Sequence, residues 1–215
     1  MKIGIVGAGR IGGNLASMWA KQRHEVMLSY SRDPKNLEQA ASAIGALASA
    51  GSVREAVEFG DVVLFSVPWS KVDEVVEEMG DLDGKVVIDT TNQFASGGLD
   101  ELPDGKTAAE LNAERLGGAG GKYVKAFNTL TAGFQGAAAG REGDERAAMF
   151  FCGDDDEAKQ TVKTLIRDIG FAPVDVGGCA DAALMEPPRR EGAVYGEELK
   201  KPAAREFVEK VRSGG

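Results

Sequence analysis

The sequence predicts an α/β fold with a doubly wound, mainly parallel sheet, and three observations support this prediction. Short apolar runs rich in β-branched residues alternate with segments of helical periodicity along most of the 215 residues. Some runs, such as residues 61–67, show no polar alternation, which is typical of strands buried on both faces. A glycine-rich turn separates the first run from the first helical segment. Together these features indicate a Rossmann-type fold with a short C-terminal extension.

The glycine-rich turn between the first strand and the first helix is suited to a dinucleotide. Residues 2–6 form the apolar run, and apolar residues recur at helical spacing from residue 11 onward. The first glycine permits a tight turn, the second lets a pyrophosphate approach the backbone, and the third lets helix pack on strand. We therefore predict that a pyrophosphate rests on this helix N-terminus. The residues predicted to hold it are Gly7, Ala8, Gly9, Arg10, Ile11 and Gly12.

The end of the second predicted strand, residues 25–29, distinguishes NADP from NAD. An acidic residue there would accept a hydrogen bond from the ribose 2′-hydroxyl and repel a 2′-phosphate. The sequence has Ser31 and Arg32 instead, and Lys35 adds a further positive charge. Asp33 is followed by proline and is interpreted as a helix N-cap. These residues predict NADP(H) as the cofactor.

Continued alternation predicts the rest of the sheet and its helices. Further strands are expected at residues 45–50, 61–67, 85–89, 123–127, 147–152 and 171–176, and helices at residues 35–43, 53–58, 70–79, 108–116 and 154–169. Residues 90–100 are predicted as a loop at the carboxyl edge of the sheet, where ligands bind in this fold. The expected division is an NADP-binding domain over residues 1–180 and a C-terminal cap or tail over residues 181–215.

Composition excludes several classes of function. The formal net charge of −9 argues against sequence-independent nucleic-acid binding and against anionic membrane surfaces. No apolar run approaches the length that spans a bilayer, so a cytoplasmic protein acting on a small molecule is expected. The two cysteines, Cys152 and Cys179, predict neither a disulfide framework nor a metal site.

Four motifs in this order resemble the coenzyme F420-dependent NADP oxidoreductase family, and also the related cytosolic domain of the six-transmembrane metalloreductases. The motifs are Ser31-Arg32, Val67-Pro68-Trp69, residues 125–129 and residues 151–154, and the resemblance covers residues 2–186. It implies a homodimer that passes a hydride between NADP(H) and coenzyme F420 or another flavin-type co-substrate. It also implies that Ser31 and Arg32 hold the 2′-phosphate. The residues implied near the ribose and nicotinamide are Val67, Pro68, Trp69, Ala126, Phe127 and Asn128.

The sequence offers few groups for acid–base catalysis. The single histidine, His24, falls on the adenosine side and is interpreted as structural. Lys125 is the alternative base, with an outward-facing strand lysine as the other interpretation. Hydride transfer between two rings needs chiefly face-to-face placement, so a site without a catalytic base is favoured. The residues expected to line it are Trp69, Asn92, Phe127, Asn128, Thr129 and Thr131.

Three hypotheses for function follow. The first is an NADPH-dependent oxidoreductase acting on a flavin-type or deazaflavin coenzyme. The second is a reductase of a small carbonyl or imine, and the third is a non-catalytic NADP-binding module. Tyr195, Arg189 and Arg190 in the tail either contact an anionic acceptor or belong to a solvated charged segment, and the second interpretation is favoured.

Overall fold

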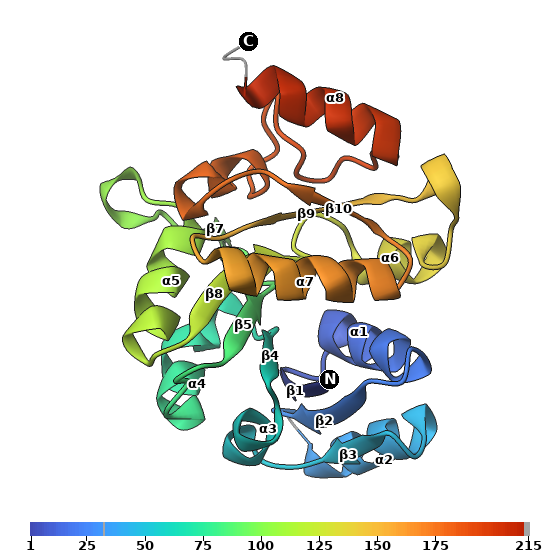
Figure 1. The fold of residues 1–215 in the computed structure, drawn as a ribbon. Helices are drawn as coiled ribbons and strands as arrows, with labels where there is room; N and C mark the ends of the chain where they lie inside the picture. Colours follow the sequence, from blue (N-terminus) through green and yellow to red (C-terminus); the bar gives the residue numbers. More distant parts are fainter. Residues whose placement is uncertain (32, 213–215) are drawn as a thin grey trace.

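The computed structural model describes residues 1–31 and 33–212, and an eight-stranded sheet forms its centre (Figure 1). The strand order is β10-β9-β8-β5-β4-β1-β2-β3. Neighbouring strands run parallel except β8 and β9, which pair antiparallel. The strands are β1 (Lys2–Val6), β2 (Glu25–Ser29), β3 (Ala48–Ala50), β4 (Val62–Phe65), β5 (Val86–Asp89), β8 (Lys122–Ala126), β9 (Ala148–Cys152) and β10 (Ala172–Asp175). This architecture confirms the predicted fold class.

Helices cover both faces of the sheet and bury a separate apolar cluster on each. One face carries α1 (Arg10–Lys21), α2 (Pro34–Ile44), α6 (Ala132–Ala138) and α7 (Asp156–Asp168). The other carries α3 (Val53–Phe59), α4 (Val72–Met79), α5 (Ala108–Gly118) and α8 (Lys201–Arg212), together with the 3-10 helix η4 (Cys179–Leu184). Three shorter 3-10 turns are η1 (Trp69–Lys71), η2 (Pro103–Gly105) and η3 (Gly143–Glu145).

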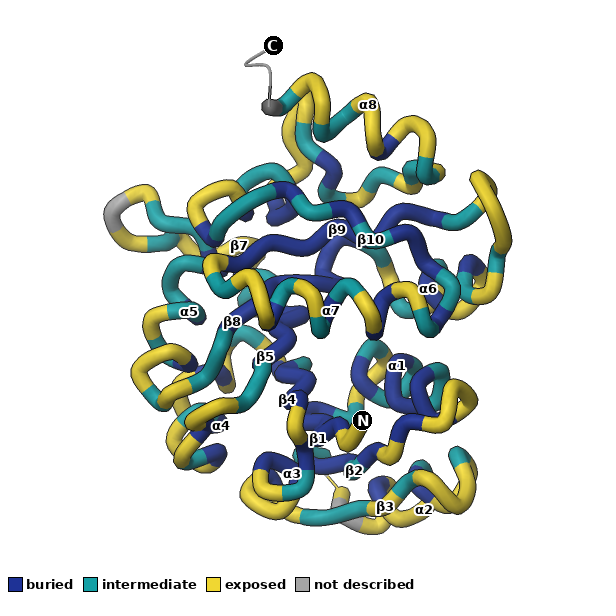
Figure 2. Tube along the Cα trace, in the orientation of Figure 1, coloured by how far each residue is buried: buried dark blue, intermediate teal, exposed yellow. Residues whose placement is uncertain are grey.

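Strand β4 shows why an unbroken apolar run becomes a central strand. Val62 and Leu64 join the apolar cluster on one face, while Val63 and Phe65 join the cluster on the other. All four are buried, and the central strands form the buried layer of the molecule in Figure 2. A strand with both faces covered has no solvent side, so polar alternation is absent.

Several predicted boundaries were wrong for identifiable reasons. The strand expected at residues 45–50 begins only at Ala48. The strand expected at residues 123–127 ends at Ala126, because Phe127 adopts the left-handed region with φ +61°. The predicted loop at residues 90–100 contains a short hairpin, β6 (Phe94–Ala95) and β7 (Gly98–Leu99). Helix α6 was not predicted, because its glycine- and alanine-rich sequence carries little apolar periodicity.

The C-terminal residues pack against the far edge of the sheet. Lys200 forms a bridge with Ala147 just before β9. The ring of Phe207 on α8 meets Phe150 of β9 edge to face, with centroids 5.7 Å apart. In Figure 1, α8 lies beyond β9 and β10, at the end of the molecule opposite β3. This segment therefore extends the core.

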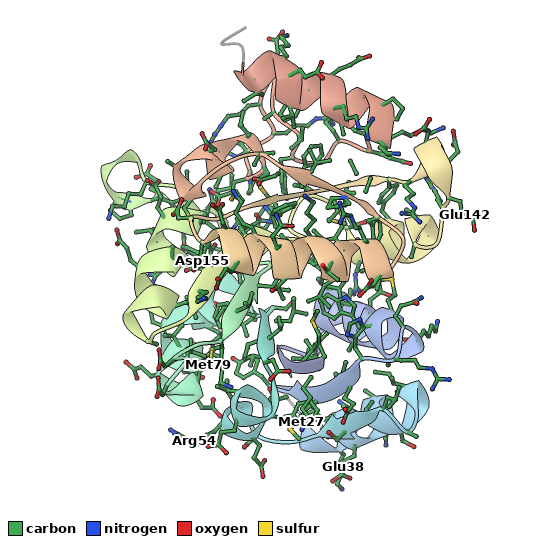
Figure 3. All side chains as sticks on the ribbon, viewed as in Figure 1. Met27, Glu38, Arg54, Met79, Glu142 and Asp155 are labelled. Carbon is green, nitrogen blue, oxygen red and sulfur yellow. The ribbon has the colours of Figure 1, made fainter. Side chains whose placement is uncertain are left out.

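Charged side chains surround the molecule. Glu38, Arg54 and Glu142 project outward in Figure 3, and all three are exposed. Within residues 1–31 and 33–212, no helix combines the length and apolarity needed to cross a membrane.

Two adjacent glycines in α1 give a matched test of how closely this helix packs. A Cβ on Gly12 would lie 2.1 Å from the carbonyl oxygen of Gly7, whereas a Cβ on Gly13 would meet only the oxygen of Ala8 at 3.6 Å. We expect Gly12→Ala to lower the free energy of unfolding by about 1–3 kcal/mol, because backbone must move. Gly13→Ala should raise it by about 0.5–1 kcal/mol, because alanine loses less entropy in a helix. Urea denaturation measures both, and equal changes would contradict the close packing of Gly12.

Candidate functional site

A cleft of about 810 Å³ opens at the carboxyl ends of β1, β4, β5 and β8. The segment after β1 contributes Gly9, Arg10 and Ile11 to its wall, and the segment after β4 contributes residues 66–69. This edge of the sheet is where ligands bind in doubly wound folds. Ten residues predicted for the site line the cleft: Gly9, Arg10, Ile11, Val67, Pro68, Trp69, Asn92, Asn128, Thr129 and Thr131.

The glycine turn leaves main-chain donors free for an anion. Gly7 has φ +107°, and a Cβ there would lie 2.3 Å from the carbonyl oxygen of Ser66. Helix α1 begins at Arg10 with no side-chain cap from the described residues, so its first N–H groups remain for a ligand. A Cβ on Gly9 would meet no described atom within 4 Å, so space remains beside the backbone there. These features fit a pyrophosphate on the N-terminus of α1.

The residues predicted for the adenosine side follow the end of β2. Ser31 is half-buried and Lys35 is exposed, while Arg32 falls outside the described residues. Asp33 caps α2, its carboxylate accepting a 3.0 Å hydrogen bond from the backbone N–H of Lys35. The prediction that Asp33 is an N-cap is therefore confirmed, and this carboxylate is already engaged by the helix terminus.

Several other predicted site residues do not line the cleft. Ala126 and Phe127 are fully buried, and the ring of Phe127 packs edge to face on Trp19 with centroids 5.7 Å apart. Their side chains therefore do not line the cleft. Gly7, Ala8 and Gly12 form the turn beneath the lining residues.

A reciprocal amide pair joins the segments after β5 and β8. The Asn92 side chain donates to the carbonyl oxygen of Asn128 at 3.0 Å, and the Asn128 amide donates to Oδ1 of Asn92 at 3.0 Å. Asn128 also donates to the carbonyl oxygen of Met185 at 2.6 Å. Two side chains that line the cleft are therefore fixed to each other and to the C-terminal segment.

Two aromatic residues outside the predicted site also line the cleft, and for one of them, Tyr195, a solvated segment was the favoured interpretation. Phe94 of the hairpin and Tyr195 of the C-terminal segment both line the cleft, with ring centroids 6.5 Å apart and planes tilted by 46°. The backbone N–H of Gly196 donates to the carbonyl oxygen of Thr129 at 2.9 Å, which fixes this segment beside β8. Tyr195 thus belongs to the site and not to a solvated tail, whereas Arg189 and Arg190 are exposed.

The charges at the cleft are few. Among the described residues that line the cleft, Arg10 and Glu198 are the two with charged side chains. Glu198 pairs with Arg141 at 2.9 Å. Burial raises the pKa of Tyr195 above its ordinary value of 10, so its hydroxyl stays protonated at neutral pH. No group of three or more His, Cys, Asp or Glu in the described part of the chain is placed to hold a metal ion.

Lys125 lies in a buried ionic cluster behind the cleft. Its Nζ lies 2.8 Å from the carbonyl oxygen of Thr91, 3.2 Å from Oε1 of Glu186 and 3.4 Å from Oδ2 of Asp89. These three acceptors match the three donors of an ammonium group. Burial is the largest single influence and lowers the pKa of Lys125, but the charges of Asp89 and Glu186 outweigh it and raise the pKa.

Neither interpretation of Lys125 from the sequence was correct. Its side chain is fully buried, so it does not face outward, and it is not among the residues that line the cleft. A fully hydrogen-bonded ammonium with a raised pKa does not accept a proton at neutral pH. His24 is also remote from the cleft, since its ring contacts Asp168 at 3.0 Å and the amino terminus at 3.3 Å.

Comparison with known families gives a match over the N-terminal part of the chain. Residues 2–93 match the family described as NADP oxidoreductase, coenzyme F420-dependent. Over these residues, which include Ser31-Arg32 and Val67-Pro68-Trp69, the match confirms the resemblance drawn from the motifs. The metalloreductase STEAP3 of Rattus norvegicus is 30% identical over 185 residues, which cover 86% of this chain and 36% of the relative. The chain therefore spans little more than a third of that relative.

Solved structures share the fold over most of the chain. A hypothetical protein from Sinorhizobium meliloti is 28% identical, with a TM-score of 0.80 over 94% of this chain and 95% of that one. An Arthrobacter protein provisionally assigned as an F420-dependent NADP-reductase is 23% identical, with a TM-score of 0.71 over 85% and 87% of the two chains. A reductive aminase from Aspergillus terreus is 19% identical, with a TM-score of 0.63 over 85% and 56%.

The buried cluster predicts unequal roles for two lysines of β8. We expect Lys125→Met to lower the free energy of unfolding by about 3–5 kcal/mol, because it leaves buried carboxylates without their cation. Lys122→Met should cause a much smaller change, since Lys122 pairs with Asp155 and Glu157 in solvent.

The effect should not vary with pH near neutrality. The folded pKa of Lys125 is raised above 10.5, so its stabilisation is fully present below that value and is lost only as pH rises through the higher folded pKa. Urea denaturation between about pH 6 and 9 tests this. Equal losses of unfolding free energy for Lys125→Met and Lys122→Met would contradict the assignment. So would a loss for Lys125→Met that becomes smaller between these pH values.

Proposed function

Because residues 2–93 match the coenzyme F420-dependent NADP oxidoreductase family, we propose that the chain transfers hydride between NADP(H) and a flavin-type or deazaflavin ring, such as coenzyme F420. The observation that carries the proposal is the aromatic wall of Phe94 and Tyr195, in the same cleft that Gly9 and Arg10 of the glycine turn line. The turn would hold the dinucleotide, and the aromatic wall would hold a planar acceptor. Homodimer assembly, a cytoplasmic location and the division at residue 180 remain predictions.

The aromatic wall suits a flat, largely apolar ring. Phe94 leaves 52% of its surface exposed, although an aromatic side chain gains most from burial. Its ring and that of Tyr195 are tilted, which leaves room for a third ring to stack or meet an edge. Leu130 and Phe134 line the same cleft and add apolar surface. A planar acceptor placed here would bury this exposed surface.

The residues of the cleft are suited to orienting two rings for hydride transfer and less to acid–base catalysis. The nicotinamide supplies the hydride, and the protein supplies binding and orientation. Asn92 and Asn128 would orient the nicotinamide side through their fixed amides, while Pro68 and Trp69 would support the ribose. Transfer between two rings held face to face needs no positioned base, which agrees with a fully hydrogen-bonded Lys125 outside the cleft.

Tyr195 favours one alternative, the reduction of a small carbonyl or imine. That reaction needs a proton donor beside the acceptor atom, and the Tyr195 hydroxyl is a neutral donor in the lining of the cleft, beside the hydroxyls of serine and threonine residues. The two functions therefore require different parts of the same side chain: the ring for a planar acceptor, and the hydroxyl for a carbonyl or imine.

Cofactor preference tests the adenosine side. We expect NADPH to bind at least about tenfold more tightly than NADH, because two or more charge-assisted hydrogen bonds hold the 2′-phosphate. Arg32→Asp should reverse this preference by repelling the phosphate and accepting a hydrogen bond from the ribose. Fluorescence titration with each nucleotide measures both effects. Equal affinity of the unaltered protein for NADPH and NADH would refute the NADP assignment.

Acceptor chemistry is tested by following NADPH absorbance with coenzyme F420, FMN, riboflavin, a ferric chelate and a cyclic imine offered separately. We expect turnover with a ring acceptor, and Tyr195→Phe should retain it within about threefold because the aromatic face remains. Tyr195→Ala should raise KM for that acceptor about tenfold or more by removing the stacking surface.

The competing outcomes are distinct. Turnover of the imine alone, lost on Tyr195→Phe, would replace the ring acceptor with the carbonyl or imine function. Tight NADPH binding without oxidation by any acceptor would favour a non-catalytic NADP-binding module.

A further inference from the structure

Three ionic side chains lie buried between the cleft and the C-terminal segment. Asp89 ends β5, Lys125 is on β8, and Glu186 follows η4, about 60 residues later in the chain. Asp89 and Lys125 are fully buried, and Glu186 is 2% exposed. Burying three charges is costly unless each is paired and hydrogen-bonded, so the partners of each one indicate what the cluster does.

Asp89 is satisfied by neutral donors as well as by Lys125. Its carboxylate accepts hydrogen bonds from the Tyr123 hydroxyl at 2.7 Å, the Asn112 amide at 3.0 Å and the Thr91 backbone N–H at 2.7 Å. Lys125 donates at 2.8 Å to the carbonyl oxygen of the same Thr91. Both backbone polar groups of Thr91 are therefore held by the cluster, and Thr91 lines the cleft.

Glu186 connects the cluster to a helix terminus. Its carboxylate accepts hydrogen bonds from the backbone N–H groups of Ala108 at 2.9 Å and Ala109 at 2.8 Å, at the start of α5. A carboxylate is favoured at a helix N-terminus, where the dipole is positive. Oε1 also lies 3.2 Å from Lys125. The Glu186 carboxylate is therefore stabilised by the N-terminus of α5 and by the ammonium group of Lys125.

The residues on either side of Glu186 contact the cleft segments. The carbonyl oxygen of Met185 accepts from Asn128, and that of Pro187 accepts from the Gln93 side chain at 3.0 Å. The chain then continues to Tyr195, whose neighbour Gly196 is bound to Thr129. Hydrogen bonds thus join the C-terminal segment to Gln93 and to residues 128–129.

We propose that Lys125 and Glu186 are positioning residues, which hold the Thr91–Asn92 backbone against the nicotinamide half of the cofactor. This inference rests on the proposed function for its cofactor. Neither side chain lines the cleft. Lys125 acts through the carbonyl oxygen of Thr91, which does line it, and Glu186 acts through Lys125. Replacing one Glu186 oxygen by an NH₂ group would direct a donor at the α5 N–H groups or at Lys125, and the Thr91 segment would shift.

The test compares NADPH with 2′,5′-ADP, which lacks the nicotinamide half. For Glu186→Gln we expect the Kd of 2′,5′-ADP to stay within about twofold, because the glycine turn and the end of β2 are distant from the cluster in the sheet order. The Kd of NADPH should rise about tenfold, as for the loss of one hydrogen bond. With an acceptor present, kcat should fall on the order of 10- to 100-fold from misplacement of the ring. Calorimetry and fluorescence titration give the two Kd values.

Two further variants separate positioning from folding. Glu186→Asp keeps the charge and should recover part of the NADPH affinity and of kcat, whereas a purely steric role predicts no recovery. Glu191→Gln removes an exposed charge of the same segment and should change the Kd of neither NADPH nor 2′,5′-ADP. All variants are compared at a temperature where circular dichroism shows them folded.

The outcomes distinguish this inference from the proposed function. If Glu186→Gln raises the Kd of NADPH and of 2′,5′-ADP equally, or raises neither, the positioning role is overturned. A selective loss of NADPH affinity supports it even if no acceptor is turned over, in which case the proposed acceptor is wrong. Failure of the unaltered protein to bind NADPH would overturn both.

Discussion

Close backbone contact around the glycine turn is the constraint on which the cleft depends. Any Cβ on Gly7 would lie 2.3 Å from the Ser66 oxygen, and one on Gly12 would lie 2.1 Å from the Gly7 oxygen. The end of β1, the start of α1 and the end of β4 therefore meet main chain to main chain. This contact aims the uncapped N–H groups of α1 at the carboxyl edge of the sheet. The half of the site proposed for the cofactor is consequently built mostly from backbone.

That half could be predicted from the sequence because its signals are local. The spacing of three glycines within six residues specifies a turn, a close approach and a packing contact, each with one physical cause. The apolar run of β4 likewise indicates a strand covered on both faces, because no position is left for solvent. The proline that follows Asp33 indicates that Asp33 is a helix N-cap.

The facing half could not be predicted in the same way, because it forms through contacts across about 100 residues of sequence. Phe94 lies in a strand of two residues, and Tyr195 lies outside any helix or strand. Neither position has a periodic pattern to reveal its neighbours. One signal did exist: a lysine inside a strand covered on both faces requires buried carboxylates. Lys125 therefore implied partners such as Asp89, at the end of the adjacent strand, although Glu186 was beyond local inference.

Under the proposed function, this difference in construction separates cofactor choice from acceptor choice. Substitutions in the hairpin or near Tyr195 would alter side chains of the proposed acceptor wall and leave the backbone contacts of the glycine turn intact. The ionic cluster links the C-terminal segment, through Glu186 and Lys125, to Thr91 in the lining of the cleft. Stability alone does not account for it, because well-packed apolar residues are often at least as stable as buried ion pairs. An apolar replacement would, however, leave the Thr91 carbonyl without the Lys125 donor, and the cleft would lose a fixed point beside the cofactor ring.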